Sequence, residues 1–477
     1  MRGAPDIKGE VDVTQRYRIN TLQPHRVPQQ RPRASGVRYV LACIVIIVAT
    51  PFPATPVCEA QTTAAVTGSS TEASDRSIDD LNLVGAAVTM PPFVDTVLGS
   101  DSGFRRALFR EGMALRINVV PRFSQNLLDE PPRSEQQVYI GHRPTFISGV
   151  NPIFTWDLRQ FGWRQAQLTA SVGWRYATWK PAGPKTIGMT SLYLFKRWGR
   201  RRVEMKSGYL GNDLEFVGLQ VGGSTSTGAQ GVYAVLPNEV GMSYFPFAAP
   251  AVNVRVRAGT YGYVKTGAQR SLDAAGGQST ADRNPTGFRF WPEGNGLLLI
   301  NEVGYQRPST PTAPHLWFRA GYLWNSTRYI NRDSGDAQPG NACAYALVDY
   351  QLRMPEPATA GRGLFLGVTA MTASSEFNPY DRYYEVRVYQ RGTLFSRPSD
   401  VIALIASYRH HSAFVTDALV AQGKAIWRSS PSFTGTYTLH ATRGNYLSLS
   451  LGYVRGAAIT PRVKDSLTIT ANWSLYL

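Results

Sequence analysis

The sequence predicts an all-β protein, a transmembrane antiparallel up-and-down β-barrel. Three observations lead to this fold class. Apolar and polar residues alternate with a period of two in segment after segment from residue 113 to the end of the sequence. Charged residues make up 17% of the chain, below the roughly 25% that is typical of soluble globular proteins. An apolar stretch near the N-terminus has the features of an export signal.

The first 60 residues are predicted to be a secretory signal peptide. Three arginines, at positions 31, 33 and 38, precede the apolar run of residues 39–48. Small residues at positions 58 and 60 suit a signal peptidase, which places cleavage after Ala60. The apolar run is too short for a transmembrane helix, which needs about 20 residues, and a membrane anchor is the alternative interpretation.

Charge and cysteine content narrow the function classes. The chain carries a net charge of +17, of which the first 60 residues, with eight basic and four acidic side chains, contribute +4, so +13 belongs to residues 61–477. A basic exported chain is typical of contact with anionic lipid head groups or of a basic lumen. We expect no nucleic-acid partner, because basic helices, zinc-ligand spacing and RNA-binding signatures are missing. Cys343 would be the remaining cysteine, without a disulfide and at a loop or strand end.

Two segments precede the predicted strands. Residues 61–100 are rich in Thr, Ala and Ser and predict a mostly disordered linker. Residues 101–112 predict a short helix, which Ser102 caps and Gly112 ends. Residues 101–477, this helix included, are assigned to a single barrel domain.

The clearest strands lie in residues 363–409. Apolar side chains at positions 384, 386 and 388 alternate there with charged ones, and turn-forming sequences at residues 378–381 and 397–400 separate three strands. The same period of two recurs in residues 113–123, 154–158, 165–176, 191–195, 203–209, 252–257, 297–305, 316–324, 348–353, 437–441, 447–453 and 467–477.

Strand length and the lack of covering helices favour a membrane barrel. Many of these strands run roughly nine to thirteen residues, the length that a tilted strand needs to cross a bilayer. A soluble sandwich could bury the apolar faces against a second sheet. However, the apolar faces end in aromatic residues and the opposite faces carry charges, which indicates lipid outside and water inside. Such a sheet must close, since open edges leave backbone groups unpaired in hydrocarbon. Long polar connections, expected on the outer side, are residues 222–231, 267–287 and 325–340.

The polar faces of the strands supply candidate pore-lining residues. In a narrow aqueous channel, side-chain donors and acceptors replace water around a solute and then release it. A shift of one residue would turn a candidate outward, but a charge at bilayer depth is costly. The alternative is a wall residue held by cross-strand pairs. The candidates are Arg116, Arg175, Glu204, Lys206, Arg255, Arg257, Glu302, Arg319, Asp349, Arg353, Glu385, Arg387 and Arg391.

Several sequence blocks follow one another in a characteristic order. They are residues 102–113, then 192–196 with 203–210 and 212–216, then 246–257, 297–304, 361–367 and 397–404. The last two read Gly-Arg-Gly-Leu-Phe-Leu-Gly and Arg-Pro-Ser-Asp-Val-Ile-Ala-Leu. Together, over about residues 100–477, the chain resembles the carbohydrate-selective porins of the OprB type. The resemblance implies a barrel of about 16 strands with an aqueous channel that passes sugars by diffusion.

The resemblance also implies a place and partners. We expect the outer membrane of a Gram-negative bacterium, with small carbohydrates, outer-membrane lipid and lipopolysaccharide, and the barrel-insertion machinery as partners, and we leave a homo-oligomer open. The expected function is passive, sugar-preferring diffusion into the periplasm, without cofactor or metal. The alternatives are a porin of similar architecture for another small solute, such as an organic acid, an export or surface-display barrel, and a barrel enzyme.

The enzyme alternative depends on His410, His411 and Ser412, which lie near Asp417 in the sequence. Some outer-membrane barrels use Ser and His to cleave lipids. A nucleophile motif does not accompany these residues, and the pair is expected at a strand end. We therefore predict that the protein is not an enzyme.

Overall fold

The computed structural model describes residues 78–86, 90–100, 103–128, 136–184, 186–218, 235–392, 397–459 and 464–477. These residues belong to one compact unit, Glu72–Leu477. The predicted signal peptide lies outside the described residues. No helix among them is long and apolar enough to cross a membrane.

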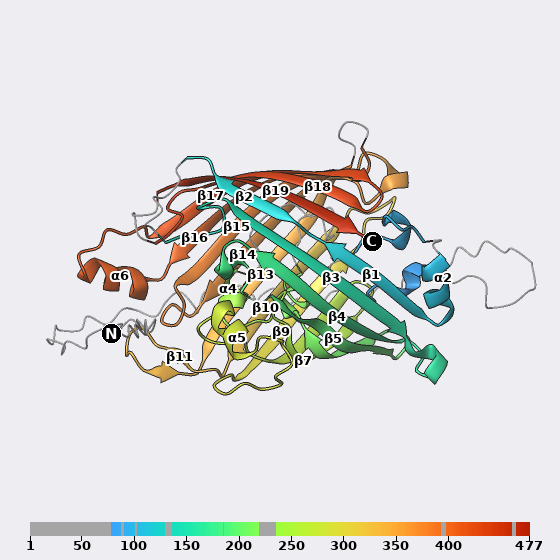
Figure 1. Ribbon diagram of the computed structural model, residues 1–477, viewed down its shortest axis with the longest axis horizontal. Helices are drawn as coiled ribbons and strands as arrows, with labels where there is room; N and C mark the ends of the chain where they lie inside the picture. The colour runs from blue at the N-terminus through green and yellow to red at the C-terminus, as the bar shows by residue number, and fades with distance from the viewer. Residues whose placement is uncertain are drawn as a thin grey trace, which may run out of the picture. The chain divides into compact units, whose positions relative to one another are not determined.

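Within the described ranges, seventeen strand segments form one antiparallel sheet (Figure 1). Two of them, β1 (Met113–Val119) and β2 (Arg122–Asn126), are successive parts of one interrupted strand, since both pair with the same two neighbouring strands. We call each complete strand of the barrel wall, interrupted or not, a stave. Pro121, which lacks a backbone N–H, stands at the break between them. The sheet therefore has sixteen staves.

The sheet closes into a barrel because the last strand pairs with the first stave. Thr468 to Asn472 pair with β2, and Leu475 and Tyr476 pair with β1. The other neighbours along the chain pair in sequence order. The remaining strands are β3 (Thr145–Asp157), β4 (Ala166–Ala177), β5 (Ile187–Trp198), β6 (Val203–Leu210), β7 (Ala249–Ala258), β8 (Gly262–Arg270), β9 (Leu297–Arg307), β10 (Leu316–Asn325), β13 (Asn341–Arg353), β14 (Gly363–Ala373), β15 (Tyr380–Arg391), β16 (Val401–His411), β17 (Ser429–Thr442), β18 (Asn445–Val454) and β19 (Ser466–Tyr476).

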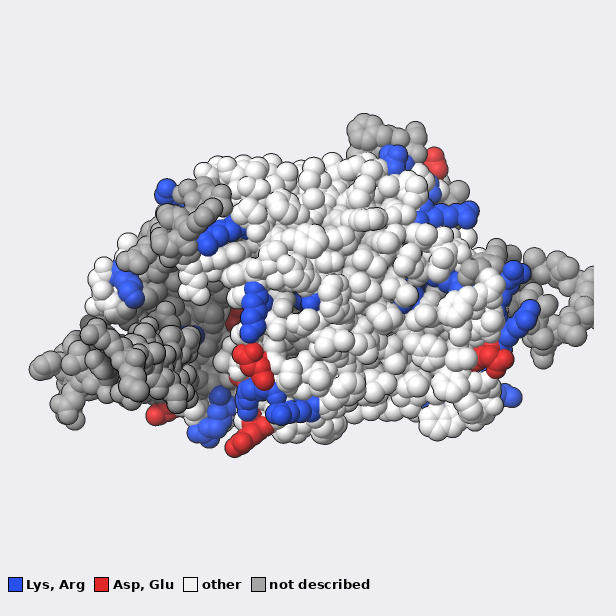
Figure 2. Space-filling view, in the orientation of Figure 1, with Lys and Arg blue, Asp and Glu red and all other residues white. Residues whose placement is uncertain are grey.

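The outer surface of the wall is apolar, as the alternation predicted. Large apolar side chains are exposed on strand after strand, among them Val172, Trp174, Val256, Leu299, Tyr322, Val386, Leu404, Leu449 and Trp473. On the face drawn in Figure 2, Lys, Arg, Asp and Glu gather mostly toward the two ends, and the middle is largely free of them. A surface of this kind is stable in contact with acyl chains and is costly in water.

The two ends of the barrel differ in the length of their connections. Short turns join β5 to β6, β7 to β8 and β17 to β18 at one end, near which the C-terminus and α2 (Gly103–Arg110) also lie (Figure 1). Longer connections with short elements lie at the other end: α4 (Val235–Glu239), α5 (Gly277–Arg283), α6 (Ala413–Ala421) and the hairpin β11 (Tyr329–Ile330) with β12 (Ala337–Gln338). In outer-membrane barrels, short turns face the periplasm and long loops face outward.

Two details of the expected connections are corrected. The loop expected at residues 267–287 begins later, because β8 continues to Arg270, and it extends to residue 296. The loop expected at residues 325–340 contains the β11–β12 hairpin. The loop expected at residues 222–231 lies outside the described residues.

The segment before the barrel also differs from the expectation. Residues 61–100 were expected to be a mostly disordered linker, but η1 (Ile78–Leu81) and η2 (Phe93–Asp95) are ordered against the wall. Ile78, Leu81 and Phe93 are buried in a cluster with Ala114 of β1. Burial of these spaced apolar residues stabilises the segment against the wall. The prediction of disorder considered only the high Thr, Ala and Ser content and did not take these residues into account. Residues 61–77 lie outside the described ranges.

Candidate channel site inside the barrel

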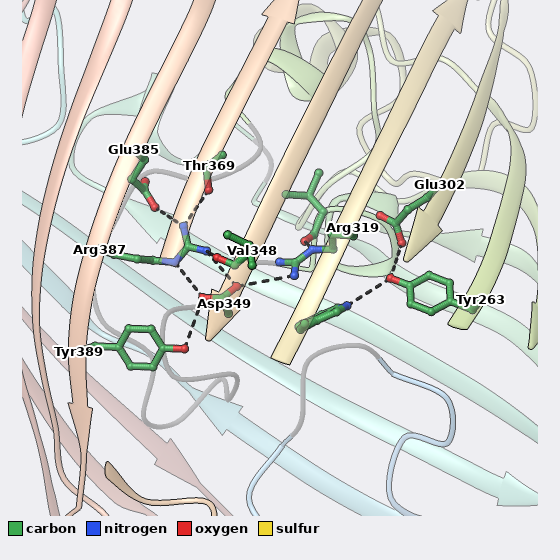
Figure 3. Close-up of polar contacts among 11 residues, drawn as sticks. Tyr263, Glu302, Arg319, Val348, Asp349, Thr369, Glu385, Arg387 and Tyr389 are labelled. Carbon is green, nitrogen blue, oxygen red and sulfur yellow. Dashed lines mark hydrogen bonds and ion pairs between the residues drawn. The ribbon is translucent and has the colours of Figure 1, made fainter. Parts of the chain in front are cut away.

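Four charged residues on the inner side of the wall form a connected network, which we call the charged layer: Arg319, Asp349, Glu385 and Arg387. The strand register brings them together, since Asp349 of β13 pairs with Gly367 of β14, and Gly367 pairs with Arg387 of β15. Glycine leaves room at the middle position, so the Arg387 side chain crosses β14 to reach Asp349 (Figure 3).

Arg387 is the centre of the charged layer. Its Nε and Nη2 donate to the two carboxylate oxygens of Asp349 at 3.1 and 2.9 Å. Its Nη1 donates to Glu385 at 2.9 Å and to the hydroxyl of Thr369 at 2.7 Å. The Arg387 side chain is 0% exposed, and a buried guanidinium is tolerated only with such full pairing. The layer is therefore a rigid part of the wall.

Arg319 of β10 extends the charged layer along the wall toward Glu302 (Figure 3). Its Nη1 lies 3.7 Å from Asp349 Oδ2, and its guanidinium stacks at 3.7 Å from the ring centroid of Trp317. Its Nε donates to the backbone carbonyl of Val217 at 2.6 Å. Val217 belongs to the connection between β6 and β7, so this hydrogen bond ties the wall to a loop inside the barrel.

Glu302 of β9 lies beside the charged layer and is held by two phenols. Tyr345 donates to one carboxylate oxygen at 2.6 Å and Tyr263 donates to the other at 2.9 Å. Trp317 Nε1 in turn donates to the Tyr263 hydroxyl at 3.2 Å. Figure 3 shows Glu302 and Tyr263 on the far side of Arg319 from Arg387. These contacts fix the orientation of Glu302, which is 2% exposed.

A second charged group lies on β6 to β8. Lys206 pairs with Glu215 at 2.6 Å, and Lys265 donates to the backbone carbonyl of Glu215. Closer to the short-turn end, Glu204 contacts Arg197 at 2.9 Å and Arg257 at 3.2 Å. The contacts of Lys206 and Lys265 with Glu215 again join the wall to the β6–β7 connection.

That connection folds into the barrel and is called here the inner loop, residues 211–218 and 235–248. Its Phe216, Val217, Leu236, Val240 and Met242 are buried against an apolar patch on the inner side of β9, β10, β13, β14 and β15. The patch is made of Leu298, Ile300, Leu323, Cys343, Tyr345, Leu347, Met371 and Tyr383. Asn325 Nδ2 also donates to the carbonyl of Val240 at 2.6 Å. The inner loop thus occupies part of the barrel cross-section.

The N-terminal segment, residues 78–86 and 90–100, contacts the barrel near the short-turn end. Thr155 of β3 donates to the carbonyl of Leu81 at 2.7 Å, and the N–H of Val97 donates to the carbonyl of Tyr476 at 2.9 Å. Arg116 stacks on the ring of Phe93 at 4.3 Å and donates to the carbonyl of Pro91. The segment is therefore tied to β3 and β19, the two strands that pair with β1.

The structure brings most of the thirteen candidates to the inner side of the wall, but in separate groups. Arg319, Asp349, Glu385 and Arg387 form the charged layer, with Glu302 beside it, and Glu204, Lys206, Arg255 and Arg257 form the group on β6 and β7. Arg116 contacts the N-terminal segment. Arg175 and Arg391 are half-buried and stack on Phe245 and Phe365. Arg353 is exposed at the end of β13, after a register shift at Gln351, and stands apart.

Sequence reasoning missed several inner cations and the inner loop. Arg122 of β2 and Arg409 of β16 are half-buried on the polar faces of their strands, so the alternation in each strand could have found them. Arg197 of β5 and Lys265 of β8, which contact Glu204 and Glu215, were also missed. The inward apolar patch gave no such signal, because its residues stand at polar-face positions that a simple alternation assigns to water. Cys343 belongs to this patch, near the start of β13.

The histidines considered for catalysis have structural partners. His410 Nδ1 lies 2.6 Å from Asp381, and His411 Nδ1 lies 2.7 Å from the backbone carbonyl of Trp427. Ser412 donates to the carbonyl of Ser375 at 2.5 Å. The hydroxyl is therefore committed to the backbone and is not placed for attack by a histidine base.

The sequence profile of the family described as "Carbohydrate-selective porin, OprB family" matches residues 177–470, more than half of the chain. The chain belongs to this family. A search of the curated proteins finds no match. As a member of the OprB family, the protein is a carbohydrate-selective porin of the Gram-negative outer membrane, which is a channel and not an enzyme.

Solved structures support the fold of this OprB-family porin. The high-pH structure of Pseudomonas putida OprB is 15% identical and superposes with a TM-score of 0.66, over 80% of this chain and 98% of that chain. The low-pH structure of the same protein is 14% identical, with a TM-score of 0.51 over the same shares. At this identity the likeness concerns the fold alone, the closed sixteen-stave barrel.

Proposed function

We propose that small sugars cross the outer membrane by passive diffusion through this barrel, and that the channel is narrowest where the inner loop lies on the charged layer. The observation that carries the proposal is the anchoring of the loop inside the barrel. Arg319 holds Val217 at 2.6 Å, and the apolar cluster around Phe216 packs the same stretch against the wall. A loop fixed in this way narrows the lumen permanently and does not act as a gate.

In this proposal the charged layer fixes the geometry of the wall. The half-buried cations contact the solute. Arg387 is saturated by Asp349, Glu385 and Thr369, so it holds the neighbouring strands in register, and Arg319 joins this wall to the loop. Arg175, Arg255 and Arg391 retain exposed surface on the inner side. A guanidinium offers several donors to sugar hydroxyls, and water-accessible contacts are weak enough for release.

The experiment uses the full chain purified in detergent and reconstituted into liposomes. We expect swelling in isotonic glucose to be faster than in an organic acid of similar size, and to fall steeply from mono- to trisaccharides. Liposomes without protein give the background. Equal rates for the sugar and the acid would contradict sugar preference.

A second candidate solute class is anionic. Nine of the thirteen candidate residues are basic and four are acidic. An excess of fixed positive charge attracts anions into a narrow lumen. In the same assay, this candidate predicts faster swelling in the organic acid than in glucose.

A further inference from the structure

A cavity lies among the long connections, and none of its lining residues belongs to the charged layer. It has a volume of about 350 Å³ and is enclosed by α4, the connection after β8, the β11–β12 hairpin and the turn between β14 and β15. In Figure 1, α4, α5 and β11 lie at the same end of the barrel. This is the end that long loops assign to the outside of the cell.

Aromatic rings fixed by their neighbours form one side of this cavity. Tyr329 and Phe377 contact each other with ring centroids 6.3 Å apart. The Tyr329 hydroxyl accepts from Asn325 Nδ2 at 3.2 Å, which holds its ring in place. Tyr244 packs edge-on against Phe247 at 5.2 Å. Tyr329 and Phe377 are 5% and 8% exposed, so only the part of each ring that lines the cavity can meet the C–H face of a pyranose.

The polar side of the cavity carries two opposite charges, Glu239 and Arg332, which attract each other. Among the residues that the structure describes, neither the Glu239 carboxylate nor the Arg332 guanidinium makes a hydrogen bond or a salt bridge, although both side chains line the cavity and are exposed to water. The Tyr244 hydroxyl is likewise unbonded in the described part of the chain. Burial first, and then the charges of Glu239 and Asp213, raise the pKa of Tyr244 to about 12, so this phenol keeps its proton.

Asp273, the third charged residue that lines the cavity, already has partners. The Asp273 carboxylate pairs with Arg283 at 2.5 Å and accepts from the N–H of Ala275 at 2.9 Å. The cavity therefore offers the Glu239 carboxylate as an acceptor, the Arg332 guanidinium as a donor and one phenol that can do either. Because the two opposite charges offset each other, a strongly anionic or cationic ligand is disfavoured, whereas a neutral polyol can hydrogen-bond to both groups.

We propose that this cavity is an outer docking site for a pyranose sugar, which is held there before it enters the lumen. The inference rests on the sugar channel proposed above and adds a second, separate binding position to it. Glu239 and Arg332 bind neighbouring hydroxyls, and the rings of Tyr329 and Phe377 cover the apolar face of the sugar. Such a site raises the sugar concentration at the channel mouth when the external concentration is low.

The first test is the Glu239→Gln variant, with Glu293→Gln as a matched control. Glu293 is an exposed carboxylate of the same group of connections and lies outside the cavity wall. Maltotriose and glucose are titrated into the detergent-solubilised full chain, and binding is followed by calorimetry. We expect Glu239→Gln to weaken binding roughly tenfold, the effect of removing a hydrogen bond to a charged group, and Glu293→Gln to leave it unchanged.

A second pair of variants separates the cavity from the general charge of the channel mouth. Tyr244→Phe removes a hydroxyl and keeps both the ring and the net charge, and Arg332→Gln removes the donor fork. Both are expected to weaken maltotriose binding, and Arg332→Gln, which lies outside the inner loop, is expected to keep wild-type single-channel conductance. Heat-dependent mobility on gels checks that each variant is folded.

The outcomes distinguish this inference from the function on which it rests. If wild-type liposomes swell in sugars while all three cavity variants bind maltotriose like Glu293→Gln, the docking site is wrong and the sugar channel stands. If Glu239→Gln instead abolishes binding of calcium ions and leaves sugar binding intact, the cavity is a cation site and the proposal is overturned. If the wild type discriminates against sugars in swelling, the channel proposal itself fails.

Discussion

At the scale of single residues, Gly367 decides whether the charged layer can form. It stands between Asp349 and Arg387 in the register, and a Cβ added there would lie 2.2 Å from Arg387 Nε. The guanidinium therefore needs the space that a side chain would occupy. Because Arg387 is buried, its displacement from Asp349 would leave two charges without full compensation.

We therefore expect Gly367→Ala to destabilise the barrel by about 3–5 kcal/mol, the usual cost of breaking a buried ion pair. The measurement is the free energy of unfolding in urea in the presence of lipid vesicles. Gly435→Ala is the control, since its added Cβ would be 3.6 Å from Leu404, an ordinary contact. Equal stability of the two variants would show that Arg387 moves aside without loss.

At the scale of elements, the inner loop is the part of the chain that sets the width of the lumen in our proposal. Phe216 is 0% exposed and packs in the apolar cluster, and the ammonium group of Lys265 lies 5.1 Å from its ring centroid. Arg319 and Asn325 add hydrogen bonds to loop carbonyls, and Lys206 adds a salt bridge to Glu215. Apolar packing and these polar contacts together attach the loop to the wall.

Phe216→Ala is expected to loosen the inner loop and raise single-channel conductance, because truncating a buried Phe costs about 3–5 kcal/mol of packing. Discrimination between mono- and trisaccharides in liposome swelling is expected to fall with it. Phe288→Ala, at a side chain that is 58% exposed, is the matched control and keeps wild-type conductance. A conductance of Phe216→Ala that equals the control would place the constriction elsewhere.

At the scale of the whole molecule, the interior carries more positive than negative charge. Residues 61–477 hold a net charge of +13, and the outer wall contributes little charge at bilayer depth. The half-buried inner cations Arg122, Arg175, Arg391 and Arg409 lie on β2, β4, β15 and β16. Fixed charges of this kind act over about 10 Å in 0.1 M salt, which is enough to bias ions in a narrow pore.

Reversal potentials in a potassium chloride gradient across a planar bilayer are therefore expected to show anion selectivity. The preference should weaken as the mean salt concentration rises, because screening shortens the reach of the fixed charges. The double variant Arg175→Gln with Arg391→Gln should reduce it, whereas Arg328→Gln, at an exposed residue of the outer connections, should not. Cation selectivity of the wild type would contradict this picture.

The wall was largely predictable from the sequence, and the inside of the barrel was not. Alternation placed Val386 and Val388 outward and Glu385 and Arg387 inward, since a strand turns successive side chains to opposite faces. The same rule could not say that Leu323 and Cys343 face inward onto an inner loop. It also could not say that Glu385, Arg387 and Asp349 would bind one another.

By itself, the sequence determined a closed antiparallel barrel with an apolar exterior, because strand period, strand length and the need to pair every backbone group in lipid are local or general constraints. Only the tertiary structure decided what fills the barrel. The contacts of Val217 with Arg319, of Phe93 with Arg116, and of Gly367 with Arg387 join residues from different strands and connections. Their meeting depends on register and closure, which no single segment of the chain encodes.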